Sequence, residues 1–235
     1  MPVAWAAVRI GRWGALAVAA AVLVQCAAPP DRPDAPDSPS TPAPAPPPRP
    51  PTVSPVTAAD LGASWRPGCP VDPDGLRRVE LDHWASDGRL HRGELIVAAD
   101  MVDAVIEVFT ALRDQRYPIE KMRSVAAYPG AEDEASMRDN NTSAFNCRGI
   151  SGSQRWSWHA YGRAVDINPL VNPSVDADGR IEPATGGPWL DRSRTYPGML
   201  HDGDPAVTAF LSRGWRWGGH WHSPKDYQHF EMGTR

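Results

Sequence analysis

The spacing of apolar residues in the middle of the chain predicts a β-hairpin followed by an amphipathic helix. Residues 76–98 contain two extended segments separated by Ser86-Asp87-Gly88, a composition typical of a hairpin turn. From Asp100 onward the apolar period becomes helical, with Asp100 as the expected N-cap and Pro118 beyond the end. The apolar positions of this helix are Val102, Val105, Ile106, Phe109 and Leu112. They are expected to pack as one face against a sheet.

A second, shorter helix is expected over residues 205–213. Asp204 is a typical N-cap residue, Pro205 suits the first helical position, and Gly214 suits the end. The apolar positions of this helix are Val207, Phe210 and Leu211.

Short strands are expected near 145–149, 163–168 and 227–232, whereas "GWRWGG" at 214–219 fits either a strand or a turn. "DADG" at 176–179 resembles the start of a calcium loop, but the required glutamate spacing is missing, so a turn is expected. Helices and strands do not alternate regularly. The pattern therefore favours an α+β fold, with a small, mostly antiparallel sheet and packed helices, over a doubly wound fold.

The N-terminal residues have the pattern of an export signal. Arg9 and Arg12 precede a short apolar run that ends in small residues, which is typical of a secretory signal over residues 1–28. Two processing schemes compete at its end. Cleavage after Ala28 fits an A-x-A-like site, whereas the residues up to Cys26 resemble a lipoprotein box with Cys26 as the lipid-bearing residue. Either scheme places the protein outside the cytoplasm, secreted or anchored at the cell envelope.

Residues 29–60 are predicted to be a disordered linker, because half of the chain's 26 prolines lie between positions 29 and 55. The folded domain is then expected over residues 61–235, a length sufficient for one core. Two cysteines remain in that domain, Cys69 and Cys147. In an exported protein such a pair is most simply a disulfide, which contributes about 4 to 5 kcal/mol for a loop of this length.

Charge and aromatic content narrow the class of partner. The net charge of −4 provides no basic field for nucleic acid, so nucleic acid is not expected to bind. Five of the ten tryptophans flank two histidine-containing stretches. They are Trp156, Trp158, Trp215, Trp217 and Trp221. Aromatic walls suit a pocket, and we expect Trp217 to contact substrate, although the same rings could instead fill the core.

The two histidine-containing stretches can supply one metal site. In "SWHAYGRAVDIN" (157–168), His159 precedes a turn and Asp166 lies in the returning strand, so the two side chains can meet. In "DYQHFE" (226–231), His229 is the natural third ligand. Catalytic zinc sites use three such nitrogen and oxygen ligands. Asp226, three residues before His229, is placed to accept a proton from the attacking water and to return it to a leaving amine.

These residues resemble a known family. "SWHAYGRAVDIN" resembles the S-x-H-x-x-G-x-A-x-D signature of the zinc D-alanyl-D-alanine carboxypeptidases and L-alanyl-D-glutamate endopeptidases, the VanY-like enzymes that cut peptidoglycan stem peptides. "DYQHFE" resembles the second motif of the endopeptidase branch, in which Asp-x-x-His replaces Glu-x-x-His. The resemblance extends more loosely from Cys69 to Glu231 and implies a single domain of the hedgehog/DD-peptidase type.

Carried over position by position, the resemblance implies one Zn²⁺ held by His159, Asp166 and His229, with Asp226 as the catalytic base. The family also has an arginine ahead of the first motif that faces the substrate and the developing oxyanion. Arg148 is the best match for it.

Three further residues near the first motif have roles to assign. Arg155 and Arg163 compete with Arg148 for the arginine role. Ser157 matches the serine of the signature and is expected to hydrogen-bond within the site, where it also counts as a substrate contact. No nucleophile elbow surrounds Ser157, so it is not expected to attack the substrate.

The expected function is thus a zinc metallopeptidase, a monomer, that hydrolyses peptidoglycan stem peptides and meets the membrane only through its signal or lipid anchor. Two alternatives stay open: a non-catalytic, zinc-containing module that binds the cell wall, and a structural lipoprotein that stores or senses zinc. The sequence does not decide which bond is cut, what the loop-rich segment 170–200 does, or whether His220 and His222 are ligands or pocket rim.

Overall fold

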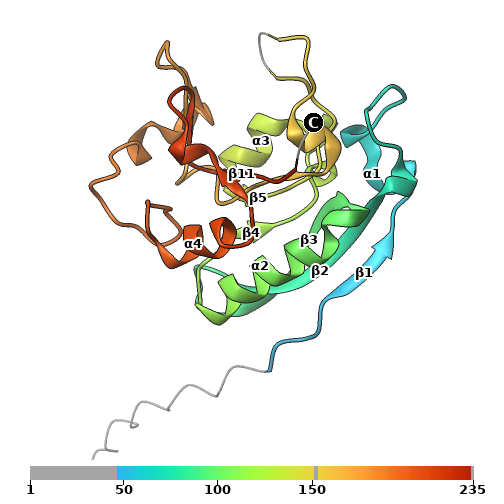
Figure 1. Ribbon diagram of the computed structural model, residues 1–235, viewed down its shortest axis with the longest axis horizontal. Coiled ribbons are helices and arrows are strands. Elements are labelled where there is room, and N and C mark those ends of the chain that lie inside the picture. The colour runs from blue at the N-terminus through green and yellow to red at the C-terminus, as the bar shows by residue number, and fades with distance from the viewer. Residues whose placement is uncertain (1–46, 151–152, 234–235) are drawn as a thin grey trace, which may run out of the picture. The chain divides into compact units, whose positions relative to one another are not determined.

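The longest strands form the hairpin predicted from the sequence. The computed structural model describes residues 47–150 and 153–233. In it, β2 (Leu76–Trp84) and β3 (Leu90–Ala98) pair antiparallel along their full length. Helix α2 (Val102–Asp114) lies along this sheet (Figure 1). The apolar side of the helix is buried. The predicted hairpin and helix are confirmed.

The helix begins differently from the prediction. Met101 is at the N-cap of α2, whereas Asp100 lies in a preceding 3₁₀ turn and forms an ion pair with Arg163. The expectation that Asp100 caps this helix is therefore wrong, because its carboxylate binds a guanidinium on another segment.

The ordered domain starts before the predicted boundary. Strand β1 (Thr52–Pro55) pairs antiparallel with β2, which gives the sheet order β1-β2-β3. Arg49 adds an ion pair to the buried Asp82, with Nη2 2.9 Å from Oδ1. The prediction of a linker reaching residue 60 is thus wrong for its last part, because backbone hydrogen bonds hold the segment on the sheet edge. The predicted signal peptide, Cys26 and the linker up to residue 46 lie outside the described residues.

Three smaller sheets complete the fold. Their strands are β6 (Ala164–Asp166), β11 (His229–Glu231) and β9 (Arg216–Trp217); β10 (Lys225–Asp226), β7 (Ser174–Val175) and β8 (Ile181–Glu182); and β4 (Lys121–Met122) with β5 (Asn141–Thr142). Among the described residues only the β4–β5 pair is parallel. The structure is therefore a mixed helix and strand fold with small antiparallel sheets, as expected.

The strand predicted near 145–149 does not form. Phe145 donates its N–H to Ile96, but Cys147 donates to Ser64 and is bonded to Cys69. These contacts hold the segment against a different part of the chain, away from a regular ladder. The disulfide Cys69–Cys147 itself, predicted from the sequence, is present in the structure.

The remaining α-helices are short, and only one of them was predicted. They are α1 (Ala58–Leu61), α3 (Asp133–Arg138) and α4 (Pro205–Leu211). Helix α4 ends two residues before the predicted 213. Asp204 stands at its N-cap, yet the Asp204 carboxylate accepts a hydrogen bond from His201 and none from the helix.

The core lies between α2, α4 and the sheet that carries β6 and β11. Phe210 of α4 stacks on Phe230 of β11, with ring centroids 3.8 Å apart, and Val165 and Ile167 are fully buried beside them. Because side chains alternate along a strand, Asp166 is left facing away from this core. Among the described residues, no helix is both long and apolar enough to cross a bilayer.

Candidate metal centre and cleft

A 3₁₀ helix and a glycine position His159. The ring belongs to the short helix η6 (Trp158–Tyr161), whose first backbone groups are capped by Ser157: its Oγ accepts a hydrogen bond from the His159 N–H at 3.3 Å. Gly162 then turns the chain with φ +66°, and a Cβ there would lie 2.5 Å from Ala98 N. Only glycine fits, so the return of the chain into β6 depends on this residue.

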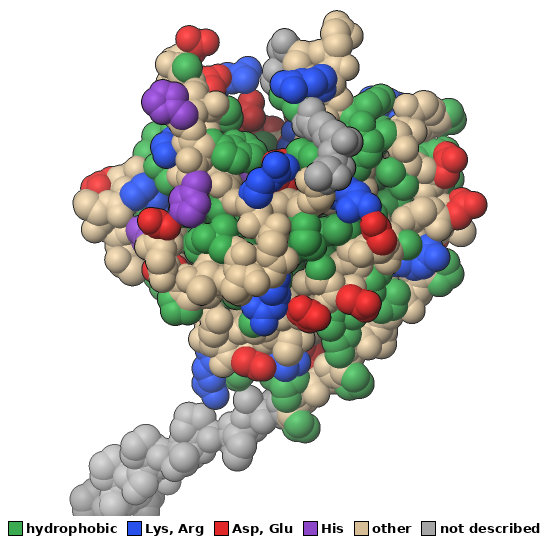
Figure 2. Space-filling model, viewed as in Figure 1, with side chains coloured by type: hydrophobic (Ala, Val, Ile, Leu, Met, Phe, Trp, Pro, Cys, Tyr) green, Lys and Arg blue, Asp and Glu red, His purple; other side chains and the backbone are tan. Residues whose placement is uncertain are grey.

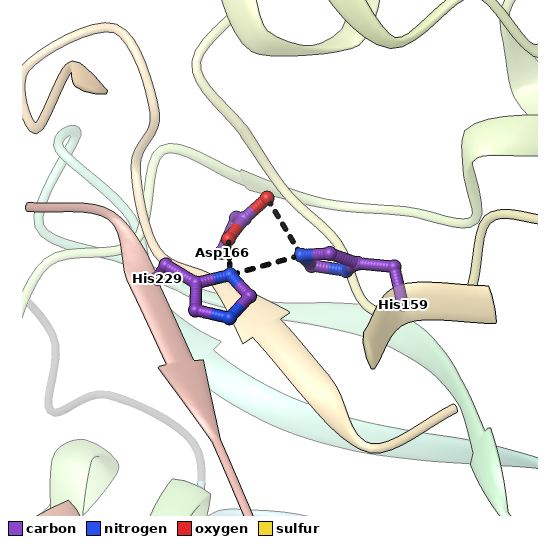
Figure 3. Close-up of side chains that lie close together, drawn as sticks. All are labelled: His159, Asp166 and His229. Atoms are coloured by element: carbon purple, nitrogen blue, oxygen red, sulfur yellow. Dashed lines mark hydrogen bonds and ion pairs between the residues drawn. The ribbon is translucent and has the colours of Figure 1, made fainter. Parts of the chain in front are cut away.

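Strand register places Asp166 beside His229. The two residues are directly opposed in the antiparallel β6–β11 pair, so their side chains project from the same face. Asp166 Oδ1 lies 3.0 Å from His229 Nδ1, and Asp166 Oδ2 lies 3.1 Å from His159 Nε2. The two imidazoles approach to 3.1 Å, Nε2 to Nδ1 (Figure 3). The structure thus brings together the three predicted ligands, all of them buried.

The outer nitrogens of both rings are already used as donors. His159 Nδ1 lies 2.5 Å from the carbonyl oxygen of Ala144, and His229 Nε2 lies 3.2 Å from a carboxylate oxygen of Glu231. Both partners are acceptors, so these nitrogens must carry the protons. The inner nitrogens then present lone pairs to each other and to the Asp166 carboxylate. Only a cation placed among them relieves this clustering of acceptors, and the donor set of two imidazoles and a carboxylate suits zinc.

In the protein without metal, the pKa values of His229 and Asp166 also indicate that a positive charge is favoured at this position. Burial alone lowers the pKa of His229, but the hydrogen bonds to Asp166 and Glu231 and the charges of Asp166 and Asp226 outweigh burial and raise the pKa to about 10. Burial alone raises the pKa of Asp166, yet the two histidines hold this pKa far below its ordinary value. A proton on His229 therefore occupies the position that a metal cation would take.

Glu231 contacts the outer nitrogen of the His229 ring. Its carboxylate accepts from His229 Nε2 with Oε2 and binds Arg216 with Oε1, 2.8 Å from Nη2. Arg216 in turn lies over the Trp158 ring. This arrangement fixes which nitrogen of His229 is protonated and which one faces Asp166 and His159.

We expect Glu231→Gln to weaken zinc binding about 10- to 100-fold, because a neutral amide holds the His229 ring and its proton less firmly than a carboxylate does. Competition with a chromophoric chelator measures the affinity directly. Glu107→Gln, at an exposed site on α2, is the matched control and should bind zinc as the unaltered protein does. Unchanged affinity in Glu231→Gln would exclude this supporting role.

Asp226 lies at the end of β10, where it pairs with Ser174 of β7. One of its oxygens, Oδ1, is buried and has no hydrogen-bond partner among the described residues. Burial and the charge of Asp166 raise the pKa of Asp226, the charges of His229, His159 and Arg148 lower it, and the net pKa is about 6. A carboxyl group with such a pKa can both accept and return a proton near neutral pH.

Arg148 also lies near the cluster of predicted ligands. Its Nε lies 2.8 Å from Asp133 Oδ2, and its Nη2 lies 4.0 Å from Asp166 Oδ2. Burial alone would lower the pKa of Arg148, but the carboxylates of Asp133, Asp166 and Asp226 raise it. Of the three arginines considered for this position, Arg148 has the carboxylate of a predicted ligand within 4.0 Å, whereas Arg163 pairs with Asp100.

Both motifs open into one cleft of about 480 Å³. Its lining includes the three predicted ligands, Asp226 and Arg148, together with Ser157, Trp158, Trp221, Gln228, Glu231 and the hairpin residues Ser174, Asp176, Arg180 and Glu182. Figure 2 shows acidic side chains inside a hollow on this face, with Lys or Arg side chains at its rim. Ser157 lies in the lining and hydrogen-bonds within the site, as expected.

The predicted substrate contact of Trp217 and the undecided role of His220 and His222 can be compared with the structure. Trp217 does not reach the cleft: it is only 3% exposed, it stacks on Phe230, and its Nε1 donates to the Tyr227 carbonyl. The expectation that Trp217 contacts substrate is therefore not supported, because the other face of β11 lines the cleft. Trp221 takes that place, 5.2 Å from the His229 ring. His220 binds Asp202 and His222 is exposed, so neither joins the cluster.

The sequence did not reveal one wall of the cleft. Segment 170–200 looked loop-rich, but its β7–β8 pair forms a hairpin that closes at Asp176–Gly179, where a turn was predicted. Strand β7 pairs with β10 and so holds Asp226 in place. The two-residue strands of this hairpin are too short to show a period of alternation, which explains why the pattern missed them.

The part of the chain that contains both motifs matches a known protein family. Residues 151–232 match the model of a family described as D-alanyl-D-alanine carboxypeptidase. The resemblance to this peptidase family is confirmed. The match spans both motifs and the hairpin between them, and it begins after Arg148 and the β2–β3 sheet. Neither the curated proteins nor the solved structures yielded a match to the chain. The family match supports a peptidase, and the clustered histidines and aspartate could hold a metal ion.

Proposed function

We propose that the protein is an exported zinc metallopeptidase that hydrolyses peptidoglycan stem peptides. The observation that carries the proposal is the convergence of four lone-pair atoms, from His159, His229 and Asp166, in a cleft that also holds a carboxyl group with a raised pKa. The family match supports the substrate class and, with it, a location outside the cytoplasm.

The metal would be held by His159 Nε2, His229 Nδ1 and the Asp166 carboxylate, and three protein ligands are the number that catalytic zinc sites use. When bound, zinc supplies Lewis-acid polarisation of a carbonyl and a lowered pKa of water. The Ala144 carbonyl and the Glu231 carboxylate hold the outer nitrogens of His159 and His229 as hydrogen-bond donors, so the inner nitrogens face the position of the metal, which would replace the second proton of His229.

Asp226 acts as the proton carrier in this proposal. In its ionised form the carboxylate accepts a proton from the water that attacks the scissile carbonyl. The same carboxyl group then donates that proton to the amine released when the C–N bond breaks. Its pKa of about 6 keeps both forms accessible near neutral pH. Arg148, held by Asp133 at the cleft wall, is placed to stabilise negative charge as it develops on the substrate.

The Asp-x-x-His form of the second motif favours cleavage between L-alanine and D-glutamate, the activity of the endopeptidase branch that it resembles. Carboxypeptidase activity at a terminal D-Ala-D-Ala would use the same set of residues. Both reactions release an amine to which Asp226 can return a proton.

Incubation of the zinc-loaded protein with defined muropeptides, followed by mass spectrometry of the products, tests the proposal. We expect one new amine terminus, either on D-glutamate or as free D-alanine. Retention of the protein on wall fragments without cleavage would instead support a non-catalytic binding module. If the protein neither cleaves the wall fragments nor is retained on them, a zinc-storing or zinc-sensing lipoprotein would be favoured.

A further inference from the structure

Three arginines line the cleft, and two of them are already engaged by carboxylates. Arg148 is bound by Asp133 at 2.8 Å. Arg180, on the β7–β8 hairpin, lies between Asp176 and Glu182, with nitrogen to oxygen distances of 3.3 and 3.6 Å. These contacts stay within the protein, so both guanidinium groups are partly neutralised before any substrate enters.

Arg155 differs from the other two. Its side chain is exposed, and within residues 47–150 and 153–233 its guanidinium has neither a carboxylate nor a hydrogen-bond partner. Its backbone, by contrast, is held: Ile150 donates to the Arg155 carbonyl at 2.9 Å, and the Arg155 N–H donates to Ser153 Oγ at 3.1 Å. The structure thus presents an unpaired cation at the cleft from a fixed backbone position.

The base of the segment that carries Arg155 is anchored on both sides. Gly149 and Trp156 form an antiparallel bridge. Arg66 lies over the Trp156 ring, 5.7 Å from its centroid, and donates to the Cys147 carbonyl at 2.8 Å. Cys147 is itself tied to Cys69 by the disulfide. These contacts hold the backbone from which the Arg155 side chain projects, so less backbone entropy is lost when this side chain binds a ligand.

Most of the charged side chains that line the cleft are acidic, so a free cation there would favour binding of an anionic substrate. Five carboxylates line it, from Asp166, Asp176, Glu182, Asp226 and Glu231. This acidic lining disfavours an anionic peptide unless a positive group compensates. Arginine is suited to the task, because its planar guanidinium matches a carboxylate with two parallel hydrogen bonds and stays charged at any physiological pH.

We infer that Arg155 recognises a free α-carboxylate on the substrate, on the residue that leaves with the new amine. The inference rests on the proposed function. Its chemistry fits both bonds considered above. Cleavage before a γ-linked D-glutamate releases a peptide, and cleavage before a terminal D-alanine releases an amino acid; in both, the residue that gains the new amine has an α-carboxylate that was free in the substrate. Arg155 is thereby a specificity-determining residue, separate from the metal ligands and from Asp226.

Two pairs of synthetic peptides test this. One pair is N-acetyl-L-Ala-γ-D-Glu-L-Lys with its D-Glu α-carboxylate either free or converted to the carboxamide. The other is diacetyl-L-Lys-D-Ala-D-Ala as the C-terminal acid or amide. For the pair that is cleaved, we expect the zinc-loaded protein to favour the acid about 10- to 100-fold in kcat/KM, mainly through KM.

Arg155→Gln should remove this preference by lowering kcat/KM for the acid alone, and Arg155→Lys should retain part of it because the charge remains. Arg180→Gln is the matched control: its guanidinium is engaged by Asp176 and Glu182, so acid and amide should change alike. An unaltered protein without preference for the acid would overturn the inference. Equal losses for acid and amide in Arg155→Gln would overturn it as well.

Failure of the proposed function gives a different result. If neither pair is cleaved, the peptidase proposal fails, and calorimetric titration of the same peptides into the zinc-loaded protein decides the inference alone. Tighter binding of an acid than of its amide, with the difference lost in Arg155→Gln, would support carboxylate recognition. Equal affinities of acid and amide for the unaltered protein would refute it.

Discussion

Asp226→Asn is expected to lower kcat about 10²- to 10⁴-fold while leaving zinc content at the level of the unaltered protein. The amide cannot accept the proton of the attacking water, which removes the general acid-base contribution. Zinc content is unaffected because Asp226 is not one of the three residues whose donor atoms converge. Steady-state kinetics on a cleaved muropeptide, with elemental analysis of the same samples, measure both quantities.

The matched control for this variant is Asp178→Asn. Asp178 is exposed in the turn of the β7–β8 hairpin, outside the cleft lining, and its variant should keep the turnover of the unaltered protein. An Asp226→Asn protein with more than about a tenth of the original kcat would contradict the role of Asp226 as base.

The pH profile provides a second measurement on Asp226. In the proposed mechanism activity requires the ionised carboxylate, and burial is the main cause that raises its net pKa to about 6 in the protein without metal. A bound divalent cation favours the ionised form, so the acidic limb of kcat/KM is expected at or below about pH 6. Asp226→Asn should lack this limb. An acidic limb that persists in the variant would assign it to another group.

The raised pKa of Asp226 also lowers the free energy of unfolding of the metal-free protein at neutral pH. The folded-state pKa of Asp226 lies above the ordinary value of 3.8, so ionisation of this group opposes folding above about pH 6, and the cost is relieved as the pH falls toward 4. At pH 7.5 the metal-free Asp226→Asn protein should therefore exceed the unaltered protein in free energy of unfolding by on the order of 1 to 3 kcal/mol. Chemical denaturation of both proteins measures the difference. A carboxylate retained at this cost is expected of a functional group.

His159→Ala is expected to abolish both zinc retention and hydrolysis. The variant removes one of the three converging ligand atoms, together with the ring that donates a hydrogen bond to the Ala144 carbonyl from its outer nitrogen. Elemental analysis should find about one zinc per unaltered chain and nearly none in the variant. Zinc at 1,000 times its dissociation constant should stabilise the unaltered protein by about 4 kcal/mol, and this stabilisation should vanish in the variant.

His220→Ala and His222→Ala are the controls, because His220 is bound to Asp202 and His222 is exposed, outside the cluster. Both should keep zinc and activity. If either control lost zinc and His159→Ala kept it, the metal would have to bind somewhere other than at the converging residues.

Zinc binding to the unaltered protein should also release a proton. The pKa of His229 is about 10 without metal, so the ring carries a proton at pH 7.5 that must leave before Nδ1 can bind a cation. Zinc affinity is therefore expected to rise about tenfold for each pH unit up to that pKa. Calorimetry in two buffers with different ionisation enthalpies counts the proton. Zinc binding without proton release would exclude His229 as a ligand.

The elements with a long, regular pattern were predictable, and the cleft wall was not. The hairpin 76–98 and helix α2 have enough residues to show their periods, and both form as expected. The hairpin of β7 and β8 has strands of two residues each, so its existence depends on pairing with β10, a partner about fifty positions along the chain. Trp217 shows the same limit, because both a pocket wall and a core position suit a tryptophan.

By itself, the sequence predicted which side chains would carry the proposed chemistry: two histidines and two aspartates in two motifs, an arginine ahead of the first motif, and a disulfide to hold the domain. It could do so because spacing within a turn or a strand controls which face a side chain takes. Only the tertiary structure decided that His229 opposes Asp166 in register, that Glu231 and Ala144 orient the rings, and that Arg155 alone among the three arginines of the cleft has no internal carboxylate among the described residues. Such relations depend on contacts between distant segments, which local sequence pattern does not encode.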